Sequence, residues 1–294
     1  MEMNLEVERV LDAQSKLGEG VVWDAQRQVV WFVDIKQNRL WHYDPDTGSN
    51  AISEAPNQIG WALPADNGQL LCGLKDGLYT YDPVAADFAK LMDVPGEIPT
   101  NRLNDACTDP WGRVWFGSMD DGESDPSGRF YVFDRGTIAP AGPDNVKITN
   151  GPAVNKAGTR IYFTDTTEQK IHVAPLSRDG VGEAQLFADT GALFPDAYPD
   201  GPIVDAEDHL WTGLYLGGMV ARFAPDGQLV ATVAMPGRDV TKMVLGGPDF
   251  KTAYVTTAIK NMEEGDYAAH PLSGSLLRFQ SPVAGFAMTP VALA

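Results

Sequence analysis

The sequence carries a lone carboxylate, Glu19, between two glycines in the stretch "KLGEGVVWD". Glycines remove side-chain bulk and let the backbone adopt conformations that other residues avoid, and strand formation needs no charge here. Polar residues in similar short motifs recur along the chain: Asn104 in "LND", Asn150 in "TNG" and Asp200 in "PDG". Their carboxylate and amide oxygens are hard ligands, which suit Ca²⁺, Mg²⁺ or Mn²⁺.

These polar residues belong to a repeat. Six strand-like runs, rich in aromatic and β-branched residues, recur along the chain: "VVWFVDI" (29–35), "QLLCGL" (69–74), "RVWFGSM" (113–119), "RIYFTDT" (160–166), "HLWTGLY" (209–215) and "TAYVTTA" (252–258). A second run follows each of them, and turn signals such as "PDTG" and "DPWG" separate the runs. Counting back eleven or twelve residues from the aromatic residue of each run, or from Leu71, reaches Glu19, Gly60, Asn104, Asn150, Asp200 and Lys242.

The repeat predicts an all-β fold. No segment shows a sustained helical period, and six units of about 40 to 50 residues, each with several short strands, are typical of a β-propeller. We therefore expect residues 1–294 to form a single domain, a six-bladed β-propeller. The strand-like N-terminal stretch "LEVERVLD" (5–12) would complete the last blade and close the ring. A β-sandwich is the rival fold, but it gives no reason for six matched units.

In a propeller, matched positions on the innermost strands form one ring around the central channel. One glutamate, one aspartate and two asparagines are expensive to bury there unless something positive satisfies them. A divalent cation is the simplest candidate. Zinc or ferrous iron could also occupy an oxygen site, so its identity stays open. The alternative is a plug of hydrogen-bonded polar residues, with water, that seals the channel.

Composition narrows the class of partner. The chain has 294 residues, a formal net charge of −18 and a pI near 4.4, which argues against nucleic acid and anionic membranes. The N-terminus resembles no signal peptide, and no apolar run approaches the roughly 20 residues that span a bilayer. We expect a cytoplasmic monomer. The two cysteines, Cys72 and Cys107, are far from any metal-binding spacing and are expected to be buried thiols.

Several motifs also resemble a known family. "LGEGVVWD", "RLNDACTDPWGRVWFGSM", "TNGPAVN", "YPDGPIVDAEDHLWTGLY" and "VTKMVLGGPDFKTAYVTTA" are similar to the senescence-marker-protein/gluconolactonase family, which includes regucalcin and bacterial sugar lactonases. The resemblance spans roughly residues 15 to 260, in the expected order. "FVDIKQ", "GLKDGLYTY" and "GSMDDGE" are most similar to bacterial aldonolactonases, particularly those that act on xylonolactone.

The resemblance implies a six-bladed propeller with one divalent metal at the mouth of its channel. The family's metal ligands fall on Glu19, Asn150 and Asp200, and its substrate-side residues fall on Arg102 and Asn104. A further acidic substrate contact follows a motif that here reads "GSMDDGES". Asp121 is our choice for it, and Glu123 remains open because the register slips there.

These residues can support the hydrolysis of a sugar lactone such as gluconolactone or xylonolactone to the aldonic acid. A divalent cation would polarise the carbonyl and lower the pKa of a water, and Asp200 is the best candidate base. Arg102 and Asn104 lie two apart on an extended segment, so they face one side and could hold sugar hydroxyls and a developing oxyanion. Without the resemblance, a surface ion pair would explain Arg102 slightly better.

Other interpretations remain open at this point. Lys242 could bind the product carboxylate or act at the carbonyl, although pairing with Asp200 or Glu19 to balance charge is favoured. A non-catalytic calcium-binding propeller is the main alternative function, since propellers host many functions. Hydrolysis of organophosphates or other esters could accompany the lactonase activity. No GxSxG, HExxH or phosphate-binding glycine loop occurs.

Overall fold

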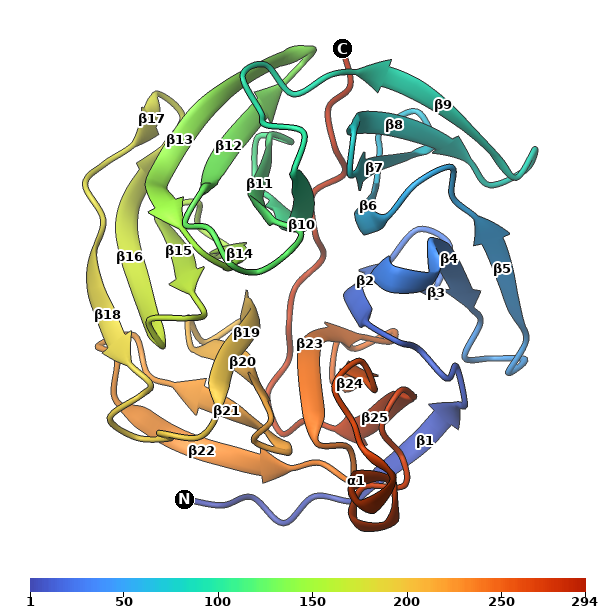
Figure 1. Cartoon of the computed structure of the whole chain (residues 1–294), viewed down its shortest axis with the longest axis vertical. Coiled ribbons are helices and arrows are strands. Elements are labelled where there is room, and N and C mark those ends of the chain that lie inside the picture. Colours follow the sequence, from blue (N-terminus) through green and yellow to red (C-terminus); the bar gives the residue numbers. More distant parts are fainter.

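The aromatic and β-branched runs of the sequence form strands in every repeat unit. In the computed structural model, which describes residues 1–294, these strands assemble into six antiparallel sheets arranged in a ring (Figure 1). The ring confirms the predicted six-bladed β-propeller. Each sheet packs against its neighbours in the ring. This packing is consistent with the prediction that residues 1–294 form a single domain.

The first three sheets follow the order of the chain. They consist of β2 (Gly18–Asp24), β3 (Val29–Asp34), β4 (Arg39–Tyr43) and β5 (Asn50–Glu54); β6 (Ile59–Pro64), β7 (Leu70–Leu74), β8 (Gly77–Asp82) and β9 (Asp87–Met92); and β10 (Asn101–Thr108), β11 (Val114–Asp120), β12 (Gly128–Asp134) and β13 (Thr137–Val146). A short 3-10 helix, η1 (Ile35–Gln37), follows β3.

The last three sheets include an extra strand and the chain's N-terminus. They consist of β14 (Thr149–Val154), β15 (Arg160–Asp165), β16 (Lys170–Ser177), β17 (Gly180–Val181) and β18 (Gln185–Asp189); β19 (Tyr198–Val204), β20 (Leu210–Tyr215), β21 (Met219–Phe223) and β22 (Leu229–Ala234); and β23 (Asp239–Gly246), β24 (Thr252–Ala258), β25 (Leu276–Gln280) and β1 (Val7–Leu11). The single α-helix, α1 (Glu264–Ala269), precedes β25, and no helix is long and apolar enough to cross a membrane.

The N-terminal strand closes the ring as predicted. β1 pairs antiparallel with β25, with Val7 opposite Phe279, so the first and last strands of the chain share the last sheet. An ion pair between Arg278 Nε and Glu8 Oε1, 2.6 Å apart, spans the same two strands. The closing sheet joins the first and last blades without an interruption in the ring.

Buried tryptophans anchor several blades against the turn that precedes their second strand. Trp115 and Trp211 are fully buried, and each indole Nε1 donates a 2.9 Å hydrogen bond to an aspartate, Asp109 and Asp205 respectively. Each aspartate also accepts from backbone N–H groups of its own turn. The aspartate therefore ties the turn to the core and satisfies an indole that would otherwise be a buried, unpaired donor.

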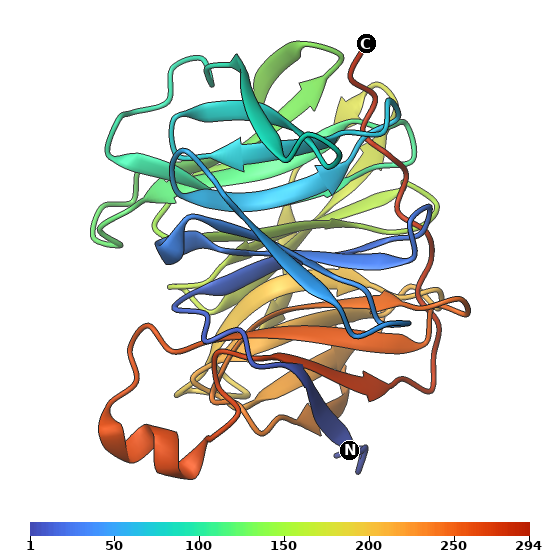
Figure 2. The same cartoon turned by 90° about the vertical axis from the view of Figure 1, so that its right-hand side faces the viewer.

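The C-terminal segment, residues 281–294, crosses the face of the ring opposite α1 (Figures 1 and 2). Its backbone bonds to three other blades: the Ala206 N–H donates to Ala284, and the Val291 and Ala292 N–H groups donate to Pro64 and Gly112. A cavity of about 340 Å³ lies beneath it, lined mainly by hydrophobic residues. None of the predicted metal ligands lines this cavity, and the loop that contains Asp121 and Glu123 lies at the α1 face, where Glu123 bonds to Lys260.

Candidate active site

The innermost strand of every sheet carries a bulge near its start. Between the innermost strand and its neighbour, two unpaired residues face one in five of the sheets. In the sheet of β6, the single residue Gly60 faces none. Glu19, Asn150 and Asp200 are each the last paired residue before the bulge. A bulge bends the strand and re-aims side chains, so these three residues share one structural position on three blades.

The glycine after each of these residues is required by the bulge. Gly20, Gly151 and Gly201 have φ angles of 56°, 72° and 41°, in the left-handed region that side chains disfavour. A Cβ on Gly201 would also lie 2.5 Å from the carbonyl oxygen of Thr241. The "EG", "NG" and "DG" pairs of the sequence are therefore the signature of this geometry.

Three residues from the sequence count occupy different positions. In β6 the residue that matches Glu19 is Ile59, so Gly60 lies one position later. The residue of β10 that matches Glu19 is Leu103, so Asn104 lies one position later, and Lys242 lies two positions beyond its counterpart, Val240. The predicted matching of Gly60, Asn104 and Lys242 with the other three was therefore wrong. The extra residue in the bulge shifts the pairing between the innermost strand and its neighbour. Counting residues back from an aromatic in the neighbouring strand does not detect this shift.

Asn104 and Arg102 nevertheless reach the same centre. The Asn104 side-chain amide donates to Asn150 Oδ1 at 3.1 Å, and the Arg102 guanidinium donates to Asn104 Oδ1. The Asn150 side-chain amide nitrogen in turn donates to the Thr166 hydroxyl at 2.9 Å. This bond orients the Asn150 side chain so that its Oδ1 points toward Asn104. The Arg102 side chain is only 3% exposed, which excludes the surface ion pair considered from the sequence.

Glu19 and Asp200 are buried carboxylates with few protein partners. Burial, and after it the charge of Asp105, raises the pKa of Glu19 to about 7. Burial, and after it the charge of Glu19, raises the pKa of Asp200 well above its usual value. Asp200 Oδ1 is buried without any hydrogen-bond partner. Two such groups are costly to ionise together unless a positive charge lies between them.

The donor set fits a hard divalent cation. Two carboxylates and the Asn150 amide oxygen supply oxygen ligands only, which suits Ca²⁺, Mg²⁺ or Mn²⁺ more than a nitrogen- or sulfur-seeking metal. No group of three or more His, Cys, Asp or Glu side chains is arranged so that it could hold a metal ion by itself. A metal site here therefore needs the amide oxygen of Asn150 in addition to the two carboxylates. A bound cation would also explain why Asp200 Oδ1 is buried without a hydrogen-bond partner.

Lys242 pairs with Asp105, an aspartate that no sequence motif had indicated. Its Nζ lies 2.8 and 2.7 Å from the two carboxylate oxygens of Asp105. The expected pairing with Asp200 or Glu19 is therefore wrong, although the role is still charge compensation. Asp105 also accepts from the Gly151 N–H at 3.0 Å, next to Asn150. Asp105 and Lys242 share the second bulge position of their strands, which is the signal that a correct alignment would have given.

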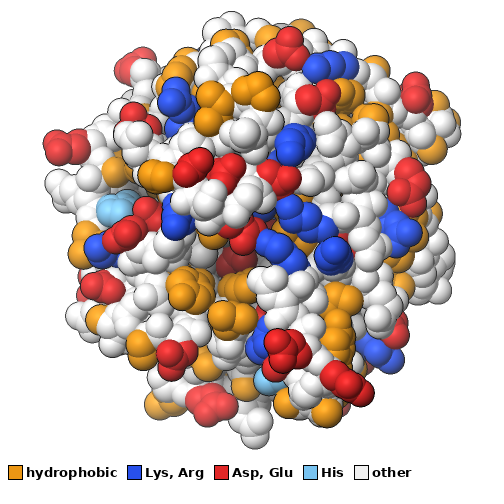
Figure 3. All heavy atoms as spheres, viewed as in Figure 1, with side chains coloured by type: hydrophobic (Ala, Val, Ile, Leu, Met, Phe, Trp, Pro, Cys, Tyr) orange, Lys and Arg blue, Asp and Glu red, His pale blue; other side chains and the backbone are white.

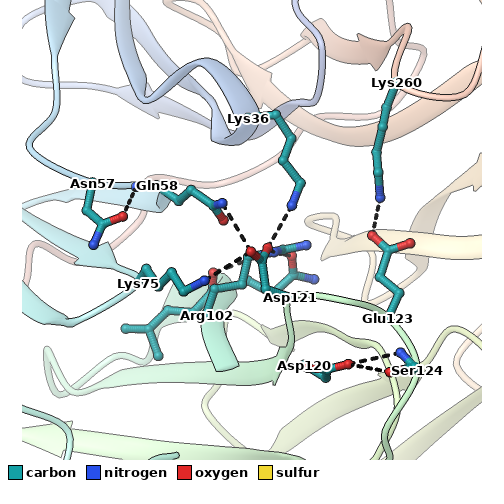
Figure 4. A network of polar contacts seen from close by, with 12 residues as sticks. Lys36, Asn57, Gln58, Lys75, Arg102, Asp120, Asp121, Glu123, Ser124 and Lys260 are labelled. Atoms are coloured by element: carbon teal, nitrogen blue, oxygen red, sulfur yellow. Dashed lines mark hydrogen bonds and ion pairs between the residues drawn. The ribbon is translucent and has the colours of Figure 1, made fainter. Parts of the chain in front are cut away.

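Asp121 lies at the rim and is surrounded by cations (Figure 4). Lys36 Nζ donates to its Oδ1 at 2.6 Å, Lys75 Nζ to its Oδ2 at 3.0 Å, and Gln58 also donates to Oδ2, at 3.2 Å. Burial alone would raise the pKa of Asp121, but the hydrogen bonds from Lys36 and Lys75 outweigh it and lower the pKa well below its usual value. Asp121 is therefore a permanently ionised anchor, and its predicted contact with substrate stays a prediction.

The alternative residue, Glu123, has a separate partner. Lys260, just before α1, donates to Glu123 Oε1 (Figure 4). Seen from the same direction as Figure 1, acidic side chains line a central hollow and lysine and arginine side chains gather along one side of it (Figure 3). No motif or spacing in the sequence pointed to Lys36, Lys75, Gln58 or Lys260 as site residues.

Comparison with known proteins identifies the family. Residues 17–259 match the family model described as "SMP-30/Gluconolactonase/LRE-like region". The chain belongs to this family. The match covers most of the chain and includes all of the inner-strand residues described above, so the resemblance inferred from the motifs is confirmed.

Individual relatives of this family are similar along nearly their whole length. A protein named 6-deoxy-6-sulfogluconolactonase from Pseudomonas putida is 30% identical over 286 residues, which is 97% of this chain and 98% of the relative. A pentonolactonase from Haloferax volcanii is 30% identical over 288 residues, 95% and 96% of the two chains. A solved structure, described as a calcium-binding protein, regucalcin, from Agrobacterium tumefaciens, has a TM-score of 0.92 at 24% identity and covers 98% of this chain and 97% of its own. At that identity the structure supports the fold alone.

Proposed function

We propose that this protein hydrolyses sugar lactones to aldonic acids with the help of one divalent cation. The two relatives that share 30% of its residues are named as lactonases of sugar acids, which supports a sugar lactone hydrolase. Metal dependence is supported by the buried carboxylates of Glu19 and Asp200. Burial raises the pKa of both groups, and Asp200 Oδ1 has no hydrogen-bond partner.

Glu19, Asn150 and Asp200 would hold the cation. When bound, a divalent cation supplies Lewis-acid polarisation of the lactone carbonyl and lowers the pKa of a neighbouring water. Asn104 fixes the Asn150 amide through its 3.1 Å hydrogen bond. Lys242 and Asp105 neutralise each other beside the donor set, so their pair adds no net charge to the centre.

Asp200 is the residue we assign to proton removal. Burial raises its pKa well above the usual value of an aspartate, and a carboxylate with a raised pKa is a stronger base. The Asp200 carboxylate would accept a proton from a water that attacks the carbonyl carbon, and would return that proton to the leaving alcohol oxygen as the ring C–O bond breaks. Arg102 and Asn104, buried beside it, would hold sugar hydroxyls and offer N–H groups to the developing oxyanion.

A non-catalytic metal-binding propeller remains the second candidate. It accounts for Glu19, Asn150 and Asp200, but it gives no reason to bury Arg102 beside them with its guanidinium directed at Asn104. A buried guanidinium next to a donor set is expected where an organic substrate must be oriented. This arrangement favours the enzyme.

The experiment is hydrolysis of gluconolactone, xylonolactone and 6-deoxy-6-sulfogluconolactone, followed with a pH indicator. We expect acid release that chelator abolishes and added divalent metal restores. Release that is unchanged after complete metal removal would contradict metal dependence, and absence of release on every lactone with metal present would leave the binding propeller.

A further inference from the structure

The rim of the site holds more positive charge than its carboxylates neutralise. Lys36, Lys75 and Arg102 all contact one carboxylate, that of Asp121, at 2.6, 3.0 and 3.3 Å (Figure 4). Three cations and one anion leave a surplus of two positive charges around Asp121 itself, apart from the deeper carboxylates Glu19 and Asp200, which also act on Arg102. The chain as a whole has a net charge of −18, so this concentration of cations is not a general property of its surface.

The neighbouring ion pair shows what a purely structural arrangement looks like. Lys260 and Glu123, from two different loops of the same rim, are matched one to one. Arg102 alone would likewise balance Asp121, with Gln58 as a neutral donor. Two further ammonium groups at the same carboxylate repel each other and Arg102, and structural anchoring gives no reason to add them.

Both lysines keep unused donors. Each Nζ donates to Asp121 and to no other group of the protein, whereas an ammonium carries three N–H donors. The Lys36 and Lys75 side chains are 16% and 28% exposed. They are therefore held in place by Asp121, partly shielded from water, and still accessible to a ligand, which is how a preorganised anion site is built.

Their position relative to the donor set is also defined. Arg102 contacts Asp121 through Nε and Asn104 through Nη1, and Asn104 contacts Asn150. A continuous series of contacts thus leads from the proposed metal ligand to the two lysines at the rim. A lactone whose carbonyl lies near Asn150 and whose hydroxyls lie along Asn104 and Arg102 would direct its far end toward Lys36 and Lys75.

We propose that Lys36 and Lys75 bind an anionic group, a sulfonate, a phosphate ester or a carboxylate, carried by the sugar lactone at the end remote from its lactone carbonyl. This inference rests on the proposed function and specifies its substrate class. Asp121 then serves to position the two ammonium groups, while its own oxygens stay occupied.

The test compares charged and neutral lactones on the same protein. We would measure kcat/KM for gluconolactone and for its 6-phospho, 6-sulfo and 6-carboxylate counterparts, with wild-type protein, Lys36→Gln and Lys75→Gln. Each variant should lower the charged-to-neutral ratio of kcat/KM by about tenfold, mainly through KM, since each removes a partly exposed hydrogen bond to a charged group. The three charged substrates reveal which anion the site prefers. Added salt should reduce the wild-type preference.

The matched control is Lys251→Gln, an exposed lysine in the turn between β23 and β24 at the opposite face. It removes the same charge and should leave the ratio unchanged. A second readout is independent of turnover: by calorimetry, 6-phosphogluconate should bind wild-type protein about tenfold more tightly than either variant, whereas gluconate should not distinguish them.

The possible results separate the two proposals. Wild-type protein that hydrolyses charged and neutral lactones with equal kcat/KM, or binds both aldonates equally, overturns this inference and leaves the proposed function intact. Protein that hydrolyses none of these lactones with metal present overturns the proposed function itself.

Discussion

The Asn104 side-chain amide donates a 3.1 Å hydrogen bond to Asn150 Oδ1, which joins a residue expected to contact substrate to one expected to bind metal. Arg102 donates to the other side of Asn104. Substrate-side and metal-side residues therefore form one network, and a change in Asn104 should be felt at the metal.

Asn104→Ala tests that link. Because it removes the partner that orients a ligand, we expect divalent-metal affinity to fall by about 10- to 100-fold, the usual range for loss of a hydrogen bond to a metal ligand. Calorimetric metal titration measures it, with Asn50→Ala on the exposed strand β5 as the control. Unchanged affinity in Asn104→Ala would show that Asn150 needs no support from its neighbour.

Asp200→Asn and Glu19→Gln should fail in different ways. Asp200→Asn keeps an oxygen ligand but removes the base, so we expect weaker yet measurable metal binding and hydrolysis reduced by about 10²-fold or more at metal saturation. Glu19→Gln should lose activity through weaker metal occupancy, and excess metal should restore part of it. Metal titration and lactone hydrolysis on both variants separate these effects. Wild-type turnover by metal-saturated Asp200→Asn would remove Asp200 from the role of base.

The metal-free protein should lose stability as the pH rises from about 4.5 to about 7. In this window folded Glu19, with its pKa raised to about 7, keeps a proton that the unfolded chain has released, so stability falls with rising pH. Saturating metal should reverse the trend, since it binds the deprotonated ligands. Thermal unfolding at several pH values in chelator measures this, and Glu19→Gln should flatten the slope. An equal slope in that variant would place the titration elsewhere.

The Lys242–Asp105 pair should contribute strongly to stability despite lying outside the donor set. Both side chains are at most 5% exposed, so Asp105→Asn leaves a buried ammonium without its counter-charge. Losing one member of such a pair typically costs about 3–5 kcal/mol of unfolding free energy. Urea unfolding of Asp105→Asn, Lys242→Met and the double variant measures it, and the double variant should recover part of the loss. Additive losses in the double variant would argue that the two residues act independently.

The fold could be predicted from the sequence because its signals are local. Each blade repeats its own aromatic runs and turns, and the spare strand-like stretch that became β1 had a single place to pair. The shared position of Glu19, Asn150 and Asp200 could be predicted for the same reason, since each precedes a glycine that the bulge needs at positive φ. Their role as metal ligands stays a prediction.

The remaining site features depend on contacts between distant segments. Lys36 and Lys75 lie 85 and 46 residues from Asp121 and meet it only through the ring, so no spacing rule connects them. The partnership of Lys242 with Asp105 spans 137 residues. This pairing could be predicted only from the true register of β10 and β23, in which Asp105 and Lys242 occupy the second bulge position. The count from the aromatic residues instead placed Asn104 and Lys242 at the position of Glu19.

The measurement closest to the central claim is the activity of chelator-treated protein as one divalent metal is added back in stoichiometric steps. If Glu19, Asn150 and Asp200 hold a single ion that lactone hydrolysis requires, hydrolysis should rise from near zero and saturate at one equivalent for a tightly bound metal. Glu19→Gln should need a large excess of the same metal. Full hydrolysis before any metal is added, or identical titrations for wild-type protein and Glu19→Gln, would contradict the account.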